Sequence, residues 1–198
     1  MPSHFLYFAY GSNLLMRRLR DRTASAVAIG WGVLPDHGLR WHMASADGSG
    51  KCDVVDDLGT RYPVHGVVYR IDSTEKPLLD QAESLGVGYH DAQATVHMGV
   101  ERVTACIYRA LRTKASLLPY DWYHALVLGG AREHGLPEDY LRRLASVTAR
   151  PDSDAQRAAQ HFALVSSAPD AVPPSACGAA TPRAGVLGAL GERSMSSR

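Results

Sequence analysis

The sequence is poor in cysteine and has almost no excess of either charge. Its three cysteines, Cys52, Cys106 and Cys177, are odd in number and form no CxxC pair, so neither a disulfide framework nor a cysteine-based metal motif is indicated. There are 21 lysine and arginine residues against 20 aspartate and glutamate residues. This balance gives no electrostatic basis for binding nucleic acid or an anionic membrane. We expect reduced thiols in a cytoplasmic protein.

Long apolar runs and metal-binding motifs are also missing. The longest apolar candidate, residues 24–35, contains Gly30 and Gly32 and is too short to cross a bilayer. The N-terminal segment MPSHFLYFAY has no basic stretch and no small-residue cleavage site, so no signal peptide is expected. The histidines are scattered without HExxH or HxH spacing, so we expect no metal site.

The composition of the chain changes near residue 168. Residues 168–198 contain no aromatic side chain and are rich in Ala, Pro, Gly and Ser. Such a segment cannot bury enough apolar surface to offset the entropy of ordering it. The sequence therefore predicts one domain over residues 1–167 and a flexible tail over residues 168–198.

The domain has the pattern of an α+β fold. Strands are predicted over residues 4–10, 64–71 and 101–109, and residues 93–98 are expected to pair with the last of these through a turn near Gly99. Helices are predicted over residues 14–22, 72–83 and 119–134, with a final one starting near Pro137. Because several strands are joined by turns, a mixed or antiparallel sheet is favoured over a doubly wound one.

The most informative stretch is YFAYGSNL, at residues 7–14. A strand that ends in Gly11-Ser12-Asn13 and leads into a helix presents backbone N–H groups at a helix N-terminus, where a carboxylate or a developing oxyanion is stabilised. The sequence contains neither GxxxxGK[ST] nor GxGxxG, so a nucleotide phosphate is not indicated. Taken alone, such a turn more often has only a structural role.

Three segments resemble those of the γ-glutamylcyclotransferase family, which includes the AIG2-like proteins. They are YFAYGSNL, LDQAE at residues 79–83 followed by Gly86, Gly88 and Tyr89, and LGGAREHGLP at residues 128–137. The resemblance implies a small mixed, mostly antiparallel β-barrel flanked by helices. It also implies release of 5-oxoproline from a small-molecule γ-glutamyl substrate without a cofactor.

The same resemblance assigns the site residues. It makes Glu83 the catalytic base, and it implies substrate binding by Tyr7, Phe8, Ala9, Tyr10, Gly11, Ser12, Asn13, Tyr89 and Tyr123. One carboxylate can suffice, because a γ-glutamyl compound carries its nucleophilic α-amine and its electrophilic γ-carbonyl in one molecule. We expect the nearby Arg17, Arg18, Arg20 and Arg22 to form a solvated helix face.

Several alternatives stay open at this point. The leaving group is that of a γ-glutamyl amino acid, a γ-glutamyl amine or, less favoured, glutathione. The turn amides hold either the α-carboxylate or the oxyanion. A protein of the same fold that binds a γ-glutamyl metabolite or a partner without turnover is the alternative to an enzyme, and Glu83 favours the enzyme. The oligomeric state is open, with a homodimer among the options.

Overall fold

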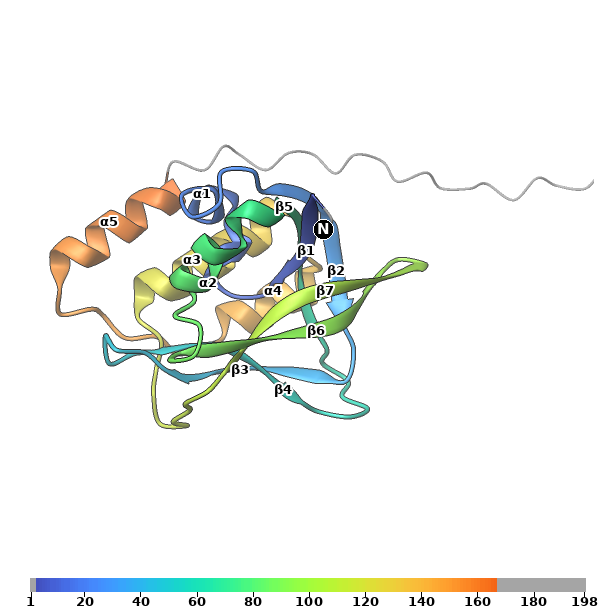
Figure 1. The fold of residues 1–198 in the computed structure, drawn as a ribbon. Helices are drawn as coiled ribbons and strands as arrows, with labels where there is room; N and C mark the ends of the chain where they lie inside the picture. Colours follow the sequence, from blue (N-terminus) through green and yellow to red (C-terminus); the bar gives the residue numbers. More distant parts are fainter. Residues whose placement is uncertain (1–2, 167–198) are drawn as a thin grey trace, which may run out of the picture.

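The computed structural model describes residues 3–166, and five of its strands close into a barrel (Figure 1). The strands are β1 (His4–Ala9), β2 (Val27–Leu34), β5 (Val64–Asp72), β6 (Tyr89–Met98) and β7 (Glu101–Ala110), in the order β1-β5-β2-β6-β7. Neighbouring strands are antiparallel except β1 and β7, which are parallel. The predicted α+β fold with a mixed, mostly antiparallel barrel is confirmed.

The hairpin between β6 and β7 follows the predicted turn. Met98 pairs with Glu101, and Gly99 between them has a φ of 62°. Glycine adopts this left-handed conformation without the steric cost that a side chain would bring. The turn fixes how β6 pairs with β7. Tyr89 of β6 and Tyr108 of β7 therefore lie on the same side of the barrel, near the end of β1.

A second, two-stranded sheet was not predicted. It consists of β3 (His37–Ala44) and β4 (Gly50–Asp56), which run together along the lower side of the barrel in Figure 1. Cys52 and Val54 of β4 are buried, and this anchors the strand on the core. The region that the sequence left unplaced therefore forms one wall of the site described below.

The segment after β1 is not the continuous helix that was predicted. A three-residue 3-10 turn, η1 (Ser12–Leu14), is followed by Leu15 in extended conformation and then by the short helix α1 (Met16–Arg20). Leu14 and Leu15 are both fully buried. An unbroken helix would point two consecutive side chains about 100° apart, whereas the break at Leu15 lets both face the core.

The remaining helices flank the barrel (Figure 1). They are α2 (Lys76–Ala82), preceded by the 3-10 turn η2 (Ser73–Glu75), α3 (Asp121–Glu133), α4 (Glu138–Ala145) and α5 (Ala155–Ser166). Asp72 accepts a hydrogen bond from the Thr74 N–H before α2, and the Glu75 carboxylate accepts from Ser25. Gly135, just after the end of α3, has a φ of 62°, the left-handed conformation in which glycine commonly terminates a helix.

Helix α3 packs directly on the backbone of η1. A Cβ on Gly130 would lie 2.2 Å from Leu15 N and 2.4 Å from Leu14 C. At the end of the same helix, the Glu133 carboxylate accepts from Met16 N at 3.1 Å. The third sequence motif therefore serves to hold the YGSNL turn in place.

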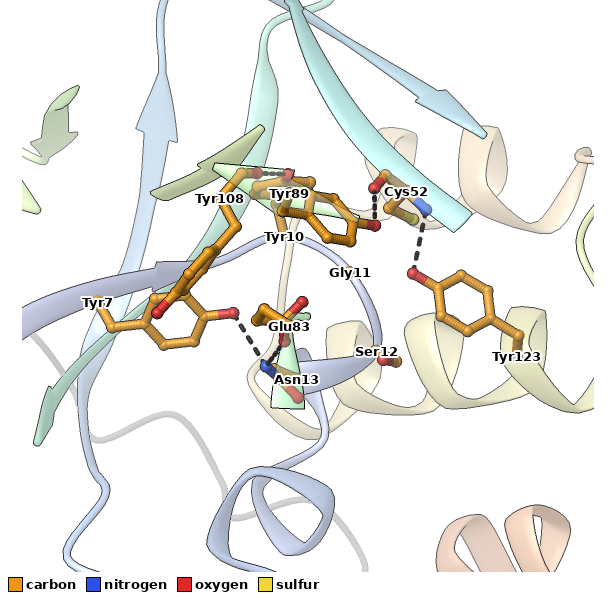
Figure 2. Close-up of a pocket in the computed structure, with 10 residues that line it drawn as sticks. All are labelled: Tyr7, Tyr10, Gly11, Ser12, Asn13, Cys52, Glu83, Tyr89, Tyr108 and Tyr123. Carbon is orange, nitrogen blue, oxygen red and sulfur yellow. Dashed lines mark hydrogen bonds between the residues drawn. The ribbon is translucent and has the colours of Figure 1, made fainter. Parts of the chain in front are cut away.

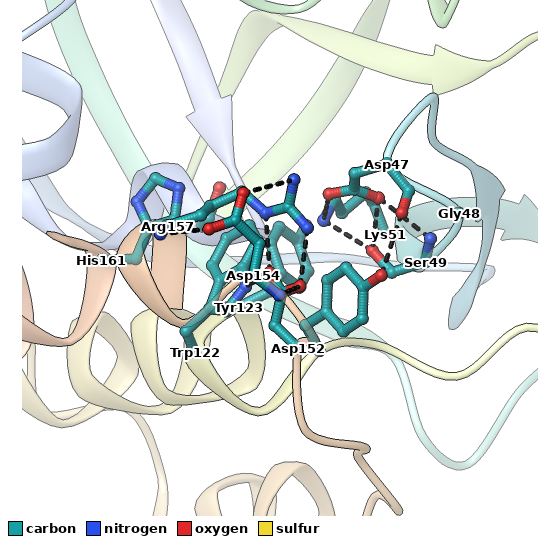
Figure 3. A network of polar contacts seen from close by, with 12 residues as sticks. Asp47, Gly48, Ser49, Lys51, Trp122, Tyr123, Asp152, Asp154, Arg157 and His161 are labelled. Carbon is teal, nitrogen blue, oxygen red and sulfur yellow. Dashed lines mark hydrogen bonds and ion pairs between the residues drawn. The ribbon is translucent and has the colours of Figure 1, made fainter. Parts of the chain in front are cut away.

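Helix α5 was not predicted, because none of its side chains is buried. Its partly buried Ala158, Leu164 and Val165 pack against the core, and polar and aromatic contacts also hold it (Figure 3). Arg157 pairs with Asp152 at 2.6 Å, and the ring of His161 stacks on Trp122 with 4.0 Å between centroids. No helix within residues 3–166 is long and apolar enough to cross a membrane. The tail predicted over residues 168–198 lies outside the described residues.

Candidate active site

A small cavity lies where the first strand ends (Figure 2). It is lined by Tyr7, Tyr10, Gly11, Ser12, Asn13, Cys52, Glu83, Tyr89, Tyr108 and Tyr123. These residues come from β1 and the turn after it, from β4, from the end of α2, from β6 and β7, and from α3. The cavity has a volume of about 30 Å³, room for one or two water molecules.

Glu83 lies at the end of α2 and points into this cavity. It is the C-cap residue of that helix, and its side chain is 15% exposed. Its Oε1 accepts hydrogen bonds from Asn13 Nδ2 at 2.7 Å and from Arg22 Nη1 at 2.9 Å. Within residues 3–166, no hydrogen bond is donated to its Oε2. One carboxylate oxygen is thus fixed and the other is available to a ligand.

The chain turns sharply after Glu83. Ser84 and Gly86 both have positive φ, of 53° and 80°, and Gly88 N donates to Ser84 O at 2.8 Å. A left-handed serine is uncommon, and it costs conformational energy that the surrounding turn must offset. The turn brings Tyr89, the first residue of β6, back to the same cavity.

Asn13 connects Glu83 to Tyr7. Its Nδ2 donates to both Glu83 Oε1 and the Tyr7 hydroxyl, the latter at 3.0 Å, while its Oδ1 accepts from Arg22 at 2.9 Å. Because the Tyr7 oxygen accepts, its own proton is free to be donated. Burial, and next the Glu83 carboxylate, raise the pKa of Tyr7 well above its ordinary value, so it stays protonated.

The other tyrosines differ in the direction of their hydrogen bonds. Tyr123 accepts from Cys52 N at 3.0 Å, and its own proton is directed at the Cys52 sulfur, which is only a weak acceptor. Tyr89 donates to Cys52 O at 2.8 Å, and Tyr10 donates to Tyr108 O. The hydroxyl protons of Tyr10 and Tyr89 are therefore held by the backbone. Burial raises the pKa of Tyr123 well above its ordinary value.

Phe8 and Ala9 do not line the cavity, unlike the other residues for which substrate binding was predicted. Both are fully buried. Successive side chains of a strand point to opposite faces, so Phe8 lies on the face away from Tyr7 and packs toward Gly66 and the Tyr10 ring. Ala9 is too short to reach beyond the barrel wall. Cys52 and Tyr108 take places at the cavity that were not predicted.

Two arginines near the site were also missed. Arg22 is only 21% exposed and pairs with Glu83, and the half-buried Arg18 donates from Nε to Ser12 Oγ at 3.0 Å. The prediction that these arginines form a solvated face is wrong for both. The spacing of four residues between them was the available signal, because it places them on one side of a helical segment.

Among residues 3–166, no three His, Cys, Asp or Glu side chains gather where they could hold a metal ion. Cys52 is buried, and this burial raises the pKa of its thiol to about 12. The thiol is therefore protonated at neutral pH and is a poor nucleophile.

Comparison with known proteins places the chain in a family. The model of the AIG2-like family matches residues 63–144. Curated γ-glutamylcyclotransferases of Bos taurus and Mus musculus are 31% and 30% identical to this sequence, and each alignment covers 72% of this chain and 78% of the relative. The chain belongs to the γ-glutamylcyclotransferase family. The human γ-glutamylcyclotransferase is 28% identical over the same shares of the two chains.

Solved structures agree with this membership of the γ-glutamylcyclotransferase family. A structure described as a γ-glutamyl cyclotransferase has a TM-score of 0.75 and 25% identity, and the match covers 82% of this chain and 98% of that one. A human protein described as uncharacterized has a TM-score of 0.73, again at 25% identity, with 83% and 99% covered. Nearly the whole length of each structure is thus matched by the barrel and its helices.

Proposed function

We propose that this protein is a γ-glutamylcyclotransferase that converts a γ-glutamyl amino acid or γ-glutamyl amine into 5-oxoproline and the free amine. The observation that carries the proposal is the position of Glu83, whose carboxylate faces the YGSN turn in a cavity that is partly open to solvent, with one oxygen unoccupied. The curated relatives named γ-glutamylcyclotransferase support the same reaction.

The reaction needs only substrate atoms and one proton carrier. The α-ammonium group gives a proton to Glu83 Oε2, and the freed amine attacks the γ-carbonyl carbon, closing a five-membered ring. Glu83 then returns its proton to the leaving nitrogen, the bond from that carbon to the leaving nitrogen breaks, and the ring nitrogen passes its second proton through Glu83 to the free amine, which departs as an ammonium ion. Because attack is intramolecular, positioning replaces an enzyme nucleophile.

Asn13 and Arg22 would hold the base in place. Both donate to Oε1, so the carboxylate cannot rotate freely, and Oε2 is left for the proton. Arg22 also forms an ion pair with this carboxylate at 2.9 Å. Asn13 is in turn fixed by Tyr7, and this extends the network across the cavity.

The hydroxyl protons of Tyr7 and Tyr123 are the proposed donors to the oxyanion, and Tyr123 would give up only its weak contact with the Cys52 sulfur. A buried phenol that stays protonated is a strong donor to a developing negative charge. Tyr10 and Tyr89 would shape the wall with their rings. Gly11 leaves room beside the Tyr123 hydroxyl, since a Cβ at residue 11 would lie 3.1 Å from that oxygen.

We further propose that the protein acts in the cytoplasm on small molecules and that the leaving end determines its preferred substrate. The sparse cysteines support the location, and Cys52 and Cys106 are free and buried. A homodimer stays a prediction from sequence, which size-exclusion chromatography with light scattering tests.

The test of the proposed function is a substrate panel. Purified protein is incubated with γ-glutamyl-alanine, a γ-glutamyl amine and glutathione, and 5-oxoproline is quantified. We expect 5-oxoproline from at least one of the first two. The absence of product from all three would contradict an enzyme and favour a binding protein of the same fold.

A further inference from the structure

The YGSN turn does not obtain its positive charge from a helix. Only three residues form η1, and the chain is extended at Leu15 before α1 begins. A macrodipole needs a run of aligned peptide units, so this turn has little of its own. An anionic ligand at Gly11, Ser12 and Asn13 must therefore find its countercharge elsewhere.

Arg18 is the cation that stands next to the turn without an acid of its own. Its Nε donates to Ser12 Oγ at 3.0 Å, and its Nη1 lies 3.3 Å from Nδ1 of His161. Within residues 3–166 no carboxylate lies within 4.0 Å of its guanidinium. By contrast, Arg22 pairs with Glu83, and Lys51 pairs with Asp47.

Arg18 stays charged in partly buried surroundings, next to His161. Burial, and next the nearby Arg22, lower the pKa of Arg18 to about 10, so it remains charged at neutral pH. Burial, followed by Arg18 and Lys51, lowers the pKa of His161 to about 4, so the imidazole is neutral and adds no charge. A half-buried, uncompensated cation is costly unless a ligand neutralises it.

The order of contacts along the turn matches the order of groups on a substrate. Asn13 contacts Glu83, which receives the α-ammonium proton, and the adjacent Ser12 contacts Arg18. The amine and the α-carboxylate of a glutamyl group are bonded to one carbon, so adjacent residues can hold them. Because Ser12 Oγ accepts from Arg18, its own proton is free to be donated to a carboxylate.

We propose that Arg18, acting through Ser12, supplies the countercharge for the substrate's α-carboxylate and so selects γ-glutamyl compounds in which that carboxylate is free. This inference rests on the proposed function. It assigns the turn to the α-carboxylate and leaves the oxyanion to Tyr7 and Tyr123. Arg18 is thus a positioning residue, since it acts on the substrate through the Ser12 hydroxyl.

The experiment pairs a change in the protein with a change in the substrate. The kcat/KM of wild type, Arg18→Gln and Arg18→Lys is measured on γ-glutamyl-alanine and on its analogue with the α-carboxylate amidated. We expect Arg18→Gln to lose about tenfold to 100-fold on the first substrate and less than about threefold on the second. Arg18→Lys should recover part of the loss. Arg17→Gln, which removes the same charge from the same short helix, should behave as wild type.

Other outcomes would overturn the inference. Equal losses on both substrates would mean that Arg18 only supports the fold. A third substrate, γ-glutamyl-alaninamide, lacks the carboxylate of the leaving alanine. If Arg18→Gln lost kcat/KM on γ-glutamyl-alanine but not on this amide, Arg18 would be assigned to the leaving group.

If wild type makes no 5-oxoproline, the proposed function fails. Calorimetric binding of 5-oxoproline and of its neutral carboxamide to wild type and Arg18→Gln then decides the role of Arg18 separately. If Arg18→Gln binds 5-oxoproline more weakly than wild type does but binds the neutral carboxamide equally well, the proposed role of Arg18 is supported. Any other result, including no binding, contradicts that role.

Discussion

Hydrogen-bond direction distinguishes the tyrosine hydroxyls around the cavity. Tyr7 and Tyr123 accept from N–H groups and keep a proton to donate, whereas Tyr89 and Tyr10 donate to backbone carbonyls. A phenol whose proton is already committed cannot stabilise a new negative charge without losing its first partner. At the scale of single residues, the direction of each hydrogen bond predicts which tyrosines contribute to turnover.

Tyr7→Phe and Tyr123→Phe should each lower kcat/KM by about tenfold to 100-fold, because each removes a donor to the transition state. Tyr89→Phe is the matched control. It loses the bond to Cys52 O and about 1 kcal/mol of stability, but should change kcat/KM by less than about threefold. Steady-state kinetics and urea unfolding of the three variants measure this. If Tyr89→Phe were the most impaired of the three variants, the assignment of Tyr7 and Tyr123 as the donors would be refuted.

At the scale of elements, the contact between α3 and η1 supports the site without touching substrate. Gly130 allows the helix backbone to lie against Leu14 and Leu15, and no side chain fits between them. The neighbouring Gly129 is different, since a Cβ there would meet only side-chain atoms, Val165 Cγ1 at 3.2 Å and Leu15 Cδ1 at 4.0 Å. The two glycines of one motif therefore make opposite predictions.

Gly130→Ala should destabilise the protein by about 1–3 kcal/mol and reduce turnover, because α3 must move away from the YGSNL turn. Gly129→Ala should be neutral or stabilising by up to about 1 kcal/mol, because alanine is the better helix former. Chemical denaturation with an activity assay on both variants tests this. Equal tolerance of both substitutions would show that the close packing on η1 is not required.

Helix α5 is held by contacts that depend on pH. In the folded chain the pKa of His161 is lowered from 6.5 to about 4 by burial and then by Arg18 and Lys51. Between these values the unfolded chain binds more protons than the folded one. The stability contributed by the neutral imidazole therefore falls as pH drops from 6.5 toward 4.

The variant His161→Phe keeps an aromatic ring on Trp122 and removes the titration. From about pH 7 to about pH 5, wild type should lose on the order of 1 kcal/mol more stability than His161→Phe. Urea midpoints at the two pH values, with hydrogen exchange of residues 155–166, provide the measurement. Parallel losses in the two proteins would contradict a role for His161.

At the scale of the whole molecule, the barrel strands with continuous apolar runs could be predicted from the sequence. It could also be predicted that Glu83 and the YGSN turn lie at one site. β2 and α5 were missed for related reasons. The exposed Val27, Ile29 and Trp31 alternate with glycine and alanine in β2, and α5 buries no side chain. Local pattern could not reveal elements whose stability comes from tertiary contacts.

The charge at the site shows the same limit. Arg18 and Arg22 look like a solvated face in sequence, because their partners Ser12, His161 and Glu83 are brought to them only by the fold. The predicted helix after β1 failed because both Leu14 and Leu15 are buried. Residue identities could be read from the sequence, but the pairing between distant segments could not.

One measurement tests the central claim directly: the rate of 5-oxoproline formation by Glu83→Gln on whichever substrate wild type accepts. Glutamine keeps the size of the side chain and can still accept from Asn13, but it cannot take the proton. We predict a fall in kcat of at least about 1,000-fold with the fold retained, while Glu101→Gln, an exposed control on β7, stays as active as wild type. Turnover by Glu83→Gln close to that of wild type would contradict the account.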